Sequence, residues 1–394
     1  MERHPHQTMC LPNYRGGSIV NLMSSVLRAY NCESEYEPLQ ILNQDELRAP
    51  RNIILLVIDG FGYEYLMEYG KKSLFAKYMR GRITSVFPAT TASGVTTFLT
   101  GVAPQQHAIT GWFMYLKEMG LVAKILPFIP RSGGLSFSLT DVDPKSIFNQ
   151  EPIFDRIGVD SYYVIYKELL NTDYTSATSR TAKGIGYQTL VDFFKKIEET
   201  IALHNEKKYI YAYWSEFDGL CHRYGTSSTE AFSHFKEMEK NLGVFLEKIK
   251  GTNTIMLITS DHGFIDTEES RTIRLKEHPQ FADTLTLPLC GEPRVAYCYV
   301  RPSRVNDFEK YVRKTFKDIC ELHRGEELIK NNYFGLFEPN EKLFDRVGDY
   351  VLIMHENYVM RDVVAGEREH YHVGNHGGVS KAEMFVPLIV IKVK

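Results

Sequence analysis

The chain has 394 residues, which is enough for one large α/β domain with an insertion or for two domains. With 43% hydrophobic residues, 24% charged residues and a formal net charge of -3, it has the composition of an ordinary globular protein and gives no sign of binding a nucleic-acid polymer. There is no membrane-spanning apolar run and no signal-like apolar segment near the start, and the six cysteines form no CxxC pair, so we expect free thiols in a cytoplasmic protein.

Strands and helices alternate through the first half of the chain. Residues 1–50 are predicted to be an N-terminal arm with one short helix near Ile19 to Arg28. The next predicted strands lie at 52–58, 83–87 and 162–166, and the predicted helices at 63–69, 73–79, 92–99 and 152–157. Residues 110–150 are rich in glycine, proline and aromatic residues, and we interpret them as a long surface excursion.

The alternation continues into the second half. A helix is predicted from residue 190 to about 201, because its apolar residues fall on one face. A strand at 209–214 follows, and Ser227 with Glu230 is predicted to form a capping box that opens a helix ending at Gly251. Further strands are predicted at 254–259, 295–300, 350–354 and 386–393, with a helix at 305–319.

This pattern predicts an α/β fold. Continuous apolar strands separated by amphipathic helices indicate a mostly parallel sheet that is sandwiched by helices. The predicted core comprises residues 51–284 and 366–394, and residues 285–365 are predicted to be a small α+β insertion. The turn from Cys290 to Arg294 is either a plain structural turn or one that reaches the edge of the active site.

Aspartates follow three of the apolar strands. Asp59 comes directly after the first strand, and Asp218 and Asp261 follow two later strands. The carboxyl ends of parallel strands share one edge of a sheet, where ligands bind. Three carboxylates gathered there would repel one another unless cations lay among them. The strand ends therefore predict a metal site.

Three histidines could complete this site. His222 lies four residues after Asp218, which places both side chains on one side of a helical turn. His262 follows Asp261 directly, and His376 stands in a glycine-rich loop. Mixed aspartate and histidine sets suit zinc, with manganese or iron as possible alternatives. Six such side chains are enough for two ions, and a pair of ions can clamp the attacking and leaving oxygens at phosphorus.

Each of these residues also has a structural interpretation. An aspartate after a strand is often a helix N-cap, and so is a threonine before a helix. A histidine in a glycine-rich loop usually lies on the surface. Three aspartates at strand ends, each with an associated histidine or close to one, are harder to explain as caps.

The region between residues 87 and 101 carries hydroxyl groups into a predicted helix. Together with the aspartates and histidines it resembles the nucleotide pyrophosphatase/phosphodiesterase branch of the alkaline phosphatase superfamily. That branch has a Pro-x-x-Thr turn ten residues before the glycine of Thr-Gly, and here Pro88-Ala-Thr-Thr91 stands ten residues before Gly101. The resemblance implies an alkaline-phosphatase-like fold and a nucleophile at Thr91, not at Thr90.

The resemblance also implies how two metal ions would be held. It covers roughly residues 50–265 and 370–394 and leaves residues 270–365 unidentified. One ion would bind Asp218, His222 and His376, and the other would bind Asp59, Asp261, His262 and the Thr91 hydroxyl.

One position departs from the pattern of that branch. Trp112 stands where its diesterases have an asparagine that helps to bind the phosphoryl oxygen. An indole is no substitute for an amide at an oxyanion, although its ring could stack on a base or an aryl leaving group. Arg180 and Lys183 are candidate replacements for phosphate contact, and a solvated surface position is the alternative for both.

The predicted function is a two-metal phosphoric-ester hydrolase with a threonine nucleophile. A phosphodiesterase or nucleotide pyrophosphatase acting on a small phosphate ester or nucleotide-like molecule is favoured. A phosphomonoesterase or a phosphonate hydrolase on the same fold is the nearest alternative, while a sulfatase or a phosphomutase fits the threonine less well. The alternative outside the enzymes is a catalytically inactive ligand-binding protein with the same fold.

Overall fold

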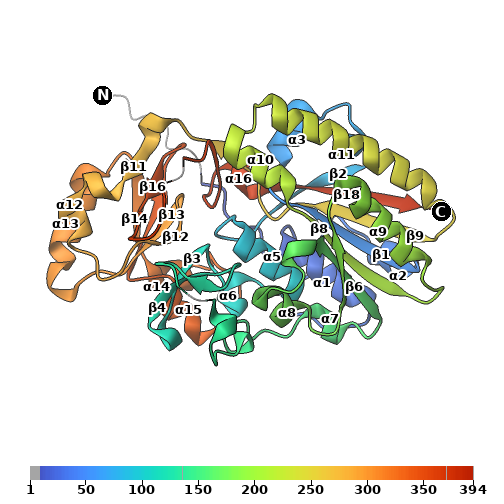
Figure 1. The fold of residues 1–394 in the computed structure, drawn as a ribbon, viewed down its shortest axis with the longest axis horizontal. Coiled ribbons are helices and arrows are strands. Elements are labelled where there is room, and N and C mark those ends of the chain that lie inside the picture. The colour runs from blue at the N-terminus through green and yellow to red at the C-terminus, as the bar shows by residue number, and fades with distance from the viewer. Residues whose placement is uncertain (1–8, 135, 370, 394) are drawn as a thin grey trace.

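The computed structural model describes residues 9–134, 136–369 and 371–393, which contain two seven-stranded sheets (Figure 1). The first sheet has the order β2-β18-β9-β1-β8-β6-β7. Its strands are β1 (Asn52–Ile58), β2 (Met79–Thr84), β6 (Asp160–Tyr166), β7 (Lys183–Tyr187), β8 (Lys208–Trp214), β9 (Thr254–Thr259) and β18 (Phe385–Val393). All neighbours from β9 to β7 pair in parallel, and β18 is antiparallel to both of its neighbours. The predicted mostly parallel sheet is confirmed.

Helices cover both faces of this sheet. The odd-numbered side chains from Ile53 to Val57 in β1 enter one core with α1 (Ile19–Ala29) and α5 (Thr91–Thr100). The even-numbered ones from Ile54 to Ile58 enter a second core with α3 (Tyr63–Tyr69), α9 (Leu190–Ala202) and α11 (Thr229–Lys248). Since successive side chains of a strand point to opposite faces, a strand buried on both faces must be apolar throughout. This requirement explains the uninterrupted apolar run of β1.

The second sheet joins two segments that are far apart in the chain. Its order is β14-β15-β13-β12-β3-β4-β5, and all of its strand pairs are antiparallel. The strands are β3 (Phe113–Leu116), β4 (Leu121–Lys124), β5 (Ile129–Pro130), β12 (Cys290–Glu292), β13 (Val295–Cys298), β14 (Cys320–Arg324) and β15 (Tyr350–Met354). The sheet therefore extends beyond the predicted insertion of residues 285–365.

The prediction of a surface excursion at residues 110–150 is wrong. Met114, Leu116 and Ala123 are fully buried in the same core as α1 and α5. The strands in this region are only two to four residues long. Strands this short show no alternating pattern of apolar and polar residues, and glycine and proline surround them. For this reason they could not be predicted from the sequence.

Most other predicted elements are present within a few residues of their predicted ends, with two clear errors. β2 ends at Thr84, so the predicted strand at 83–87 is wrong, and residues 85–90 form the loop before α5. The predicted capping box at Ser227 is wrong as well, because Ser228 is the N-cap of α11 and its Oγ accepts a hydrogen bond from Ala231 N at 3.2 Å. The predicted helix at 305–319 is shorter, as α13 (Val305–Thr315).

The remaining elements are short. Two pairs of strands form small ribbons: β10 (Ile265–Asp266) with β17 (Gly374–Asn375), and β11 (Thr272–Arg274) with β16 (Val359–Arg361). The remaining α-helices are α2 (Gln44–Arg48), α4 (Leu74–Lys77), α6 (Pro104–His107), α7 (Ile153–Arg156), α8 (Asp173–Ser179), α10 (Glu216–Tyr224), α12 (Pro279–Ala282), α14 (Gly325–Lys330), α15 (Glu341–Arg346) and α16 (Lys381–Met384).

Two findings bear on the expected environment of the chain. All six cysteines are free thiols. Within the described residues, no helix combines the length and the apolar character that crossing a membrane requires. Neither finding supports a location in the cytoplasm, which stays a prediction.

Candidate active site and metal centre

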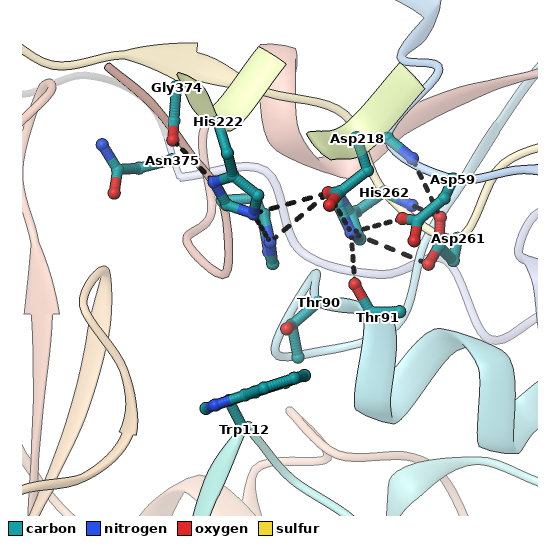
Figure 2. Close-up of polar contacts among 12 residues, drawn as sticks. Asp59, Thr90, Thr91, Trp112, Asp218, His222, Asp261, His262, Gly374 and Asn375 are labelled. Carbon is teal, nitrogen blue, oxygen red and sulfur yellow. Dashed lines mark hydrogen bonds and ion pairs between the residues drawn. The ribbon is translucent and has the colours of Figure 1, made fainter. Parts of the chain in front are cut away.

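The three aspartates meet at one edge of the first sheet (Figure 2). They follow β1, β8 and β9, and these strands are neighbours in the order β9-β1-β8. The backbone of Asp59 extends the ladder between β1 and β8, because Asp59 N donates a hydrogen bond to Trp214 O at 2.9 Å. Asp218 lies in the first turn of α10, and Asp261 comes just after β9. Parallel strands thus deliver all three carboxylates to their common carboxyl edge.

A first cluster consists of Asp59, Asp261 and His262, whose possible ligand atoms lie within 4.8 Å of one another. His262 Nε2 is 3.2 Å from Asp59 Oδ1 and 3.6 Å from Asp261 Oδ2. The same nitrogen lies 3.1 Å from Thr91 Oγ1. The other ring nitrogen of His262, Nδ1, is 3.0 Å from Gly263 O. Donation from Nδ1 to this carbonyl leaves the Nε2 lone pair facing the cluster.

A second cluster consists of Asp218, His222 and His376, again within 4.8 Å. His222 Nε2 is 3.5 Å from Asp218 Oδ1 and 3.2 Å from His376 Nε2. Its Nδ1 lies 2.9 Å from Gly374 O, so His222 is oriented in the same way as His262. The two clusters adjoin, because the rings of His262 and His376 stack with centroids 3.8 Å apart.

Both clusters fit a divalent metal ion. Four N and O ligands at 2.0–2.1 Å around a tetrahedral zinc ion are about 3.3 Å from one another. The distances of 3.1 to 3.6 Å that join His262 Nε2 to Thr91, Asp59 and Asp261 are close to this value. Among the described residues, Asp218 Oδ1 and Asp261 Oδ2 are also buried without a hydrogen-bond donor. Buried carboxylate oxygens need a partner, and a metal ion would provide one.

The electrostatics point in the same direction. Burial raises the pKa of Asp218 and that of Asp261 to about 7. Burial lowers the pKa of His262, but the carboxylates of Asp261 and Asp59 outweigh this and raise it to about 10. Two buried carboxylates and the partly buried one of Asp218 beside one imidazolium leave an excess of negative charge. Cations bound in the clusters would neutralise that excess.

Thr91 is the first residue of α5, and Thr90 is its N-cap. The helix comes very close to the strand end that carries Asp261. A Cβ atom on Gly94 would lie 2.7 Å from Asp261 Cβ, so any larger residue there would push the helix away. Ser85 Oγ also donates a hydrogen bond to Asp261 O. These contacts hold the Thr91 hydroxyl against the first cluster.

Glu292 is a site residue that the sequence did not single out. It comes from β12 in the second sheet and is 7% exposed. Its Oε1 accepts hydrogen bonds from Thr90 Oγ1 at 2.6 Å and from Trp112 N at 2.7 Å. Burial raises the pKa of Glu292 to about 7. The turn at residues 290–294 thus reaches the site edge, and an acid between glycine and proline was its one signal in the sequence.

We expect Glu292→Ala to reduce the free energy of unfolding by about 1–3 kcal/mol, because it leaves the backbone N–H of Trp112 without an acceptor. Glu292→Gln keeps the Oε1 acceptor and should lose less than half of that amount. Urea denaturation of both variants measures the difference. Equal losses would mean that the carboxylate charge, not the acceptor, holds the two loops together.

A cavity of about 650 Å³ opens beside the clusters. Its wall includes Thr91, Asp218, His222, His376, Trp112 and Arg361. Figure 2 shows the indole of Trp112 lying across the site from the histidines, beside Thr90 and Thr91. Trp112 therefore lines the site as a flat apolar wall.

Arg180 and Lys183 are not at the site. Arg180 pairs with Asp155 at 3.5 Å, and Lys183 pairs with Asp160 at 3.1 Å. Neither residue lines the cavity. Lys183 begins β7, so it lies at the amino edge of the parallel sheet, opposite the edge where the clusters form. The structure therefore does not bring these two residues to the substrate.

A mostly parallel sheet covered by helices, with aspartates and histidines gathered at its carboxyl edge, defines an alkaline-phosphatase-like α/β protein. The family model of type I phosphodiesterase/nucleotide pyrophosphatase matches residues 53–379. The chain therefore belongs to the type I phosphodiesterase/nucleotide pyrophosphatase family. This family is metal-dependent, and membership supports a phosphoric-ester hydrolase.

Known proteins resemble this chain at low sequence identity. Bis(5′-adenosyl)-triphosphatase enpp4 from Xenopus laevis is 24% identical over 241 residues, which are 57% of this chain and 50% of that protein. The chain thus spans half the length of this relative. Murine ectonucleotide pyrophosphatase/phosphodiesterase 5 has a TM-score of 0.65 at 19% identity, covering 85% of this chain and 87% of that one. Its inactive threonine-to-alanine variant has been solved in complex with AMP.

Phosphonoacetate hydrolase from Sinorhizobium meliloti 1021 has the same fold. Its complex with phosphonoformate gives a TM-score of 0.64 at 16% identity, covering 87% of this chain and 90% of that one. At these identities the solved structures confirm the alkaline-phosphatase-like fold.

Proposed function

We propose that this protein is a two-metal phosphodiesterase or nucleotide pyrophosphatase with Thr91 as its nucleophile. The observation that carries the proposal is the 3.1 Å contact between Thr91 Oγ1 and His262 Nε2, which joins the hydroxyl to the first cluster. Thr91 is only partly buried and lines the cavity, so a substrate can reach it.

In the proposed reaction the Thr91 oxygen attacks phosphorus in line and the bond to the leaving group breaks. A phosphothreonine forms, and water then cleaves it to release the product and restore the hydroxyl. The N-terminus of α5, where Thr91 lies, would offer its free backbone N–H groups to the phosphoryl oxygens. Glu292 fixes the Thr90 hydroxyl beside the nucleophile and thereby limits the motion of this loop.

Two divalent ions would be held by the two clusters, one by Asp59, Asp261, His262 and Thr91 and the other by Asp218, His222 and His376. When bound, such ions lower the pKa of the nucleophile and neutralise charge on the attacking and leaving oxygens. The donor set is best suited to zinc, and manganese or iron are the alternatives.

The names of the relatives support a small nucleotide-like substrate. One is a bis(5′-adenosyl)-triphosphatase, and another binds AMP in its inactive variant. The likeness to phosphonoacetate hydrolase keeps a phosphonate hydrolase as the second candidate function. Relative rates on a phosphodiester, a phosphomonoester and phosphonoacetate separate these activities.

Metal removal tests the proposal directly. We expect about two zinc ions per chain in the purified protein, because two clusters are present. Dialysis against a chelator should reduce hydrolysis of bis-p-nitrophenyl phosphate by at least about 100-fold, and added zinc should restore it. A protein that binds no metal and hydrolyses none of the three substrate classes would instead support a catalytically inactive binding protein.

A further inference from the structure

Arg361 carries a positive charge at the cavity wall and forms no direct ion pair with a carboxylate of the described residues. It is the last residue of β16, lines the cavity and is partly buried. Its Nη2 donates a hydrogen bond to Asn375 Oδ1 at 2.8 Å, and Asn375 directly precedes His376. Its Nε is buried without an acceptor among the described residues.

The nearby carboxylates are already engaged by other cations. Glu367 pairs with Arg131 at 3.2 Å and with Lys124 at 3.5 Å. Glu369 pairs with Arg274 at 2.5 Å and with Lys276 at 2.6 Å. Both of these carboxylates therefore form their ion pairs with cations other than Arg361.

A second cation lies directly beside Arg361. β16 pairs in parallel with β11, and the pairing sets Arg274 opposite Arg361. Burial and the charge of Arg274 both lower the pKa of Arg361. A partly buried guanidinium that faces another guanidinium is stabilised by an anion, which a guanidinium can bind through two parallel hydrogen bonds.

The position of Arg361 indicates which part of a substrate it meets. Figure 2 shows Asn375, the partner of Arg361, beyond His222 on the side of the site away from Thr91. In-line attack by Thr91 sends the leaving group away from the nucleophile. A group bound by Arg361 therefore belongs to the leaving group.

We propose that Arg361 binds a phosphate of the leaving group, so that the preferred substrates are phosphoanhydrides and not simple diesters. This assignment rests on the proposed function, in which Thr91 attacks the phosphorus. With a nucleoside triphosphate, the bond from the α-phosphorus to the bridging oxygen breaks and pyrophosphate departs toward Arg361. The guanidinium of Arg361 would donate two parallel N–H hydrogen bonds to two oxygens of that pyrophosphate.

Two substrates that share one transferred group test this assignment. Thymidine 5′-triphosphate and the p-nitrophenyl ester of thymidine 5′-monophosphate both place thymidylate on Thr91, but only the first has an anionic phosphate in its leaving group. We expect Arg361→Gln to lower kcat/KM for the triphosphate by about 10- to 100-fold, the effect of losing a charge-assisted contact, and for the aryl ester by less than about threefold. Arg361→Lys keeps the positive charge but loses the two parallel N–H donors, so its kcat/KM for the triphosphate should lie between the values for the wild type and for Arg361→Gln.

A matched control separates the local effect from net charge. Arg313 is exposed on α13, and Arg313→Gln removes the same charge far from the cavity. It should leave both rates unchanged. Equal losses on both substrates in Arg361→Gln, or no loss on either, would overturn the assignment. Zinc content is measured for each variant, because Asn375 adjoins His376.

A binding measurement keeps this test independent of turnover. Calorimetric titration of inorganic pyrophosphate into zinc-loaded Thr91→Ala protein should give a Kd that rises about tenfold or more when Arg361→Gln is added. If the wild type hydrolyses neither the triphosphate nor the aryl ester, the proposed function is wrong. The titration still tests whether Arg361 binds pyrophosphate. An unchanged Kd would show that Arg361 does not bind the pyrophosphate.

Discussion

Thr91→Ala is expected to reduce the hydrolysis of bis-p-nitrophenyl phosphate by about 10⁴-fold or more, as loss of a nucleophile does in other covalent hydrolases. Zinc should stay bound, since Asp59, Asp261 and His262 are untouched. Stopped assays with quantified p-nitrophenolate, together with metal analysis of the same samples, measure both effects. Thr91→Ser retains a hydroxyl and should keep measurable turnover.

Thr90 is the matched control for this experiment. Thr90→Val keeps the shape of the side chain and removes its hydrogen bond to Glu292. Because Thr90 is the N-cap and not the predicted nucleophile, we expect this variant to stay within about tenfold of the wild type. Full activity in Thr91→Ala, or loss of activity in Thr90→Val alone, would move the nucleophile to the other threonine.

Glu383→Ala is expected to give the largest loss of stability, about 3–5 kcal/mol in the free energy of unfolding. Arg294 and Glu383 are almost fully buried and form two parallel hydrogen bonds, each of 3.0 Å. Glu383 Oε1 also accepts a hydrogen bond from Gly378 N at 2.7 Å. Removing the carboxylate leaves the buried guanidinium with only backbone carbonyls as partners and no opposite charge, and it releases the loop that carries His376. Urea denaturation with metal present measures the loss.

The pair also predicts how stability depends on pH. Burial raises the pKa of Glu383, but Arg294 outweighs it and holds the pKa below its usual value. A carboxylate with a lowered folded-state pKa stabilises the protein above its unfolded pKa of about 4.3, and this contribution is lost as the pH falls further.

A surface pair provides the comparison for this variant. Glu247 pairs with Lys250, and both side chains are highly exposed. Glu247→Ala should therefore change stability by less than about 1 kcal/mol at any pH. If Glu383→Ala reduced the free energy of unfolding no more than Glu247→Ala does, the buried pair would not be what joins α16 to the turn that follows β12. A double change of Arg294 and Glu383 to methionine should recover much of the loss, because no charge stays buried.

The amino-acid sequence was enough to predict the candidate metal ligands and the sheet edge at which they gather. Asp59, Asp218 and Asp261 each follow an apolar strand, and the carboxyl ends of parallel strands must meet. His222 and His262 lie within four residues of an aspartate, so the local backbone places them at the same edge of the sheet. The resemblance to a known family, through the spacing from Pro88 to Gly101, then selected Thr91 among several hydroxyls.

The tertiary structure alone decided what surrounds these residues. Glu292 and Arg361 lie about 200 residues or more from Thr91 in the chain. Glu292 reaches the cavity because the second sheet pairs β12 with β3, and Arg361 reaches it on β16, which pairs with β11. Such pairings join strands of three or four residues, which carry too few side chains to show a pattern. For the same physical reason the sequence could not decide between the site and the surface for Arg180 and Lys183, because a charge in the sequence does not show which edge of a sheet it occupies. Spacing along the chain is enough to predict which side chains lie together at the end of one strand. Residues such as Glu292 and Arg361 reach the site through contacts between distant parts of the chain, so only the folded structure reveals them.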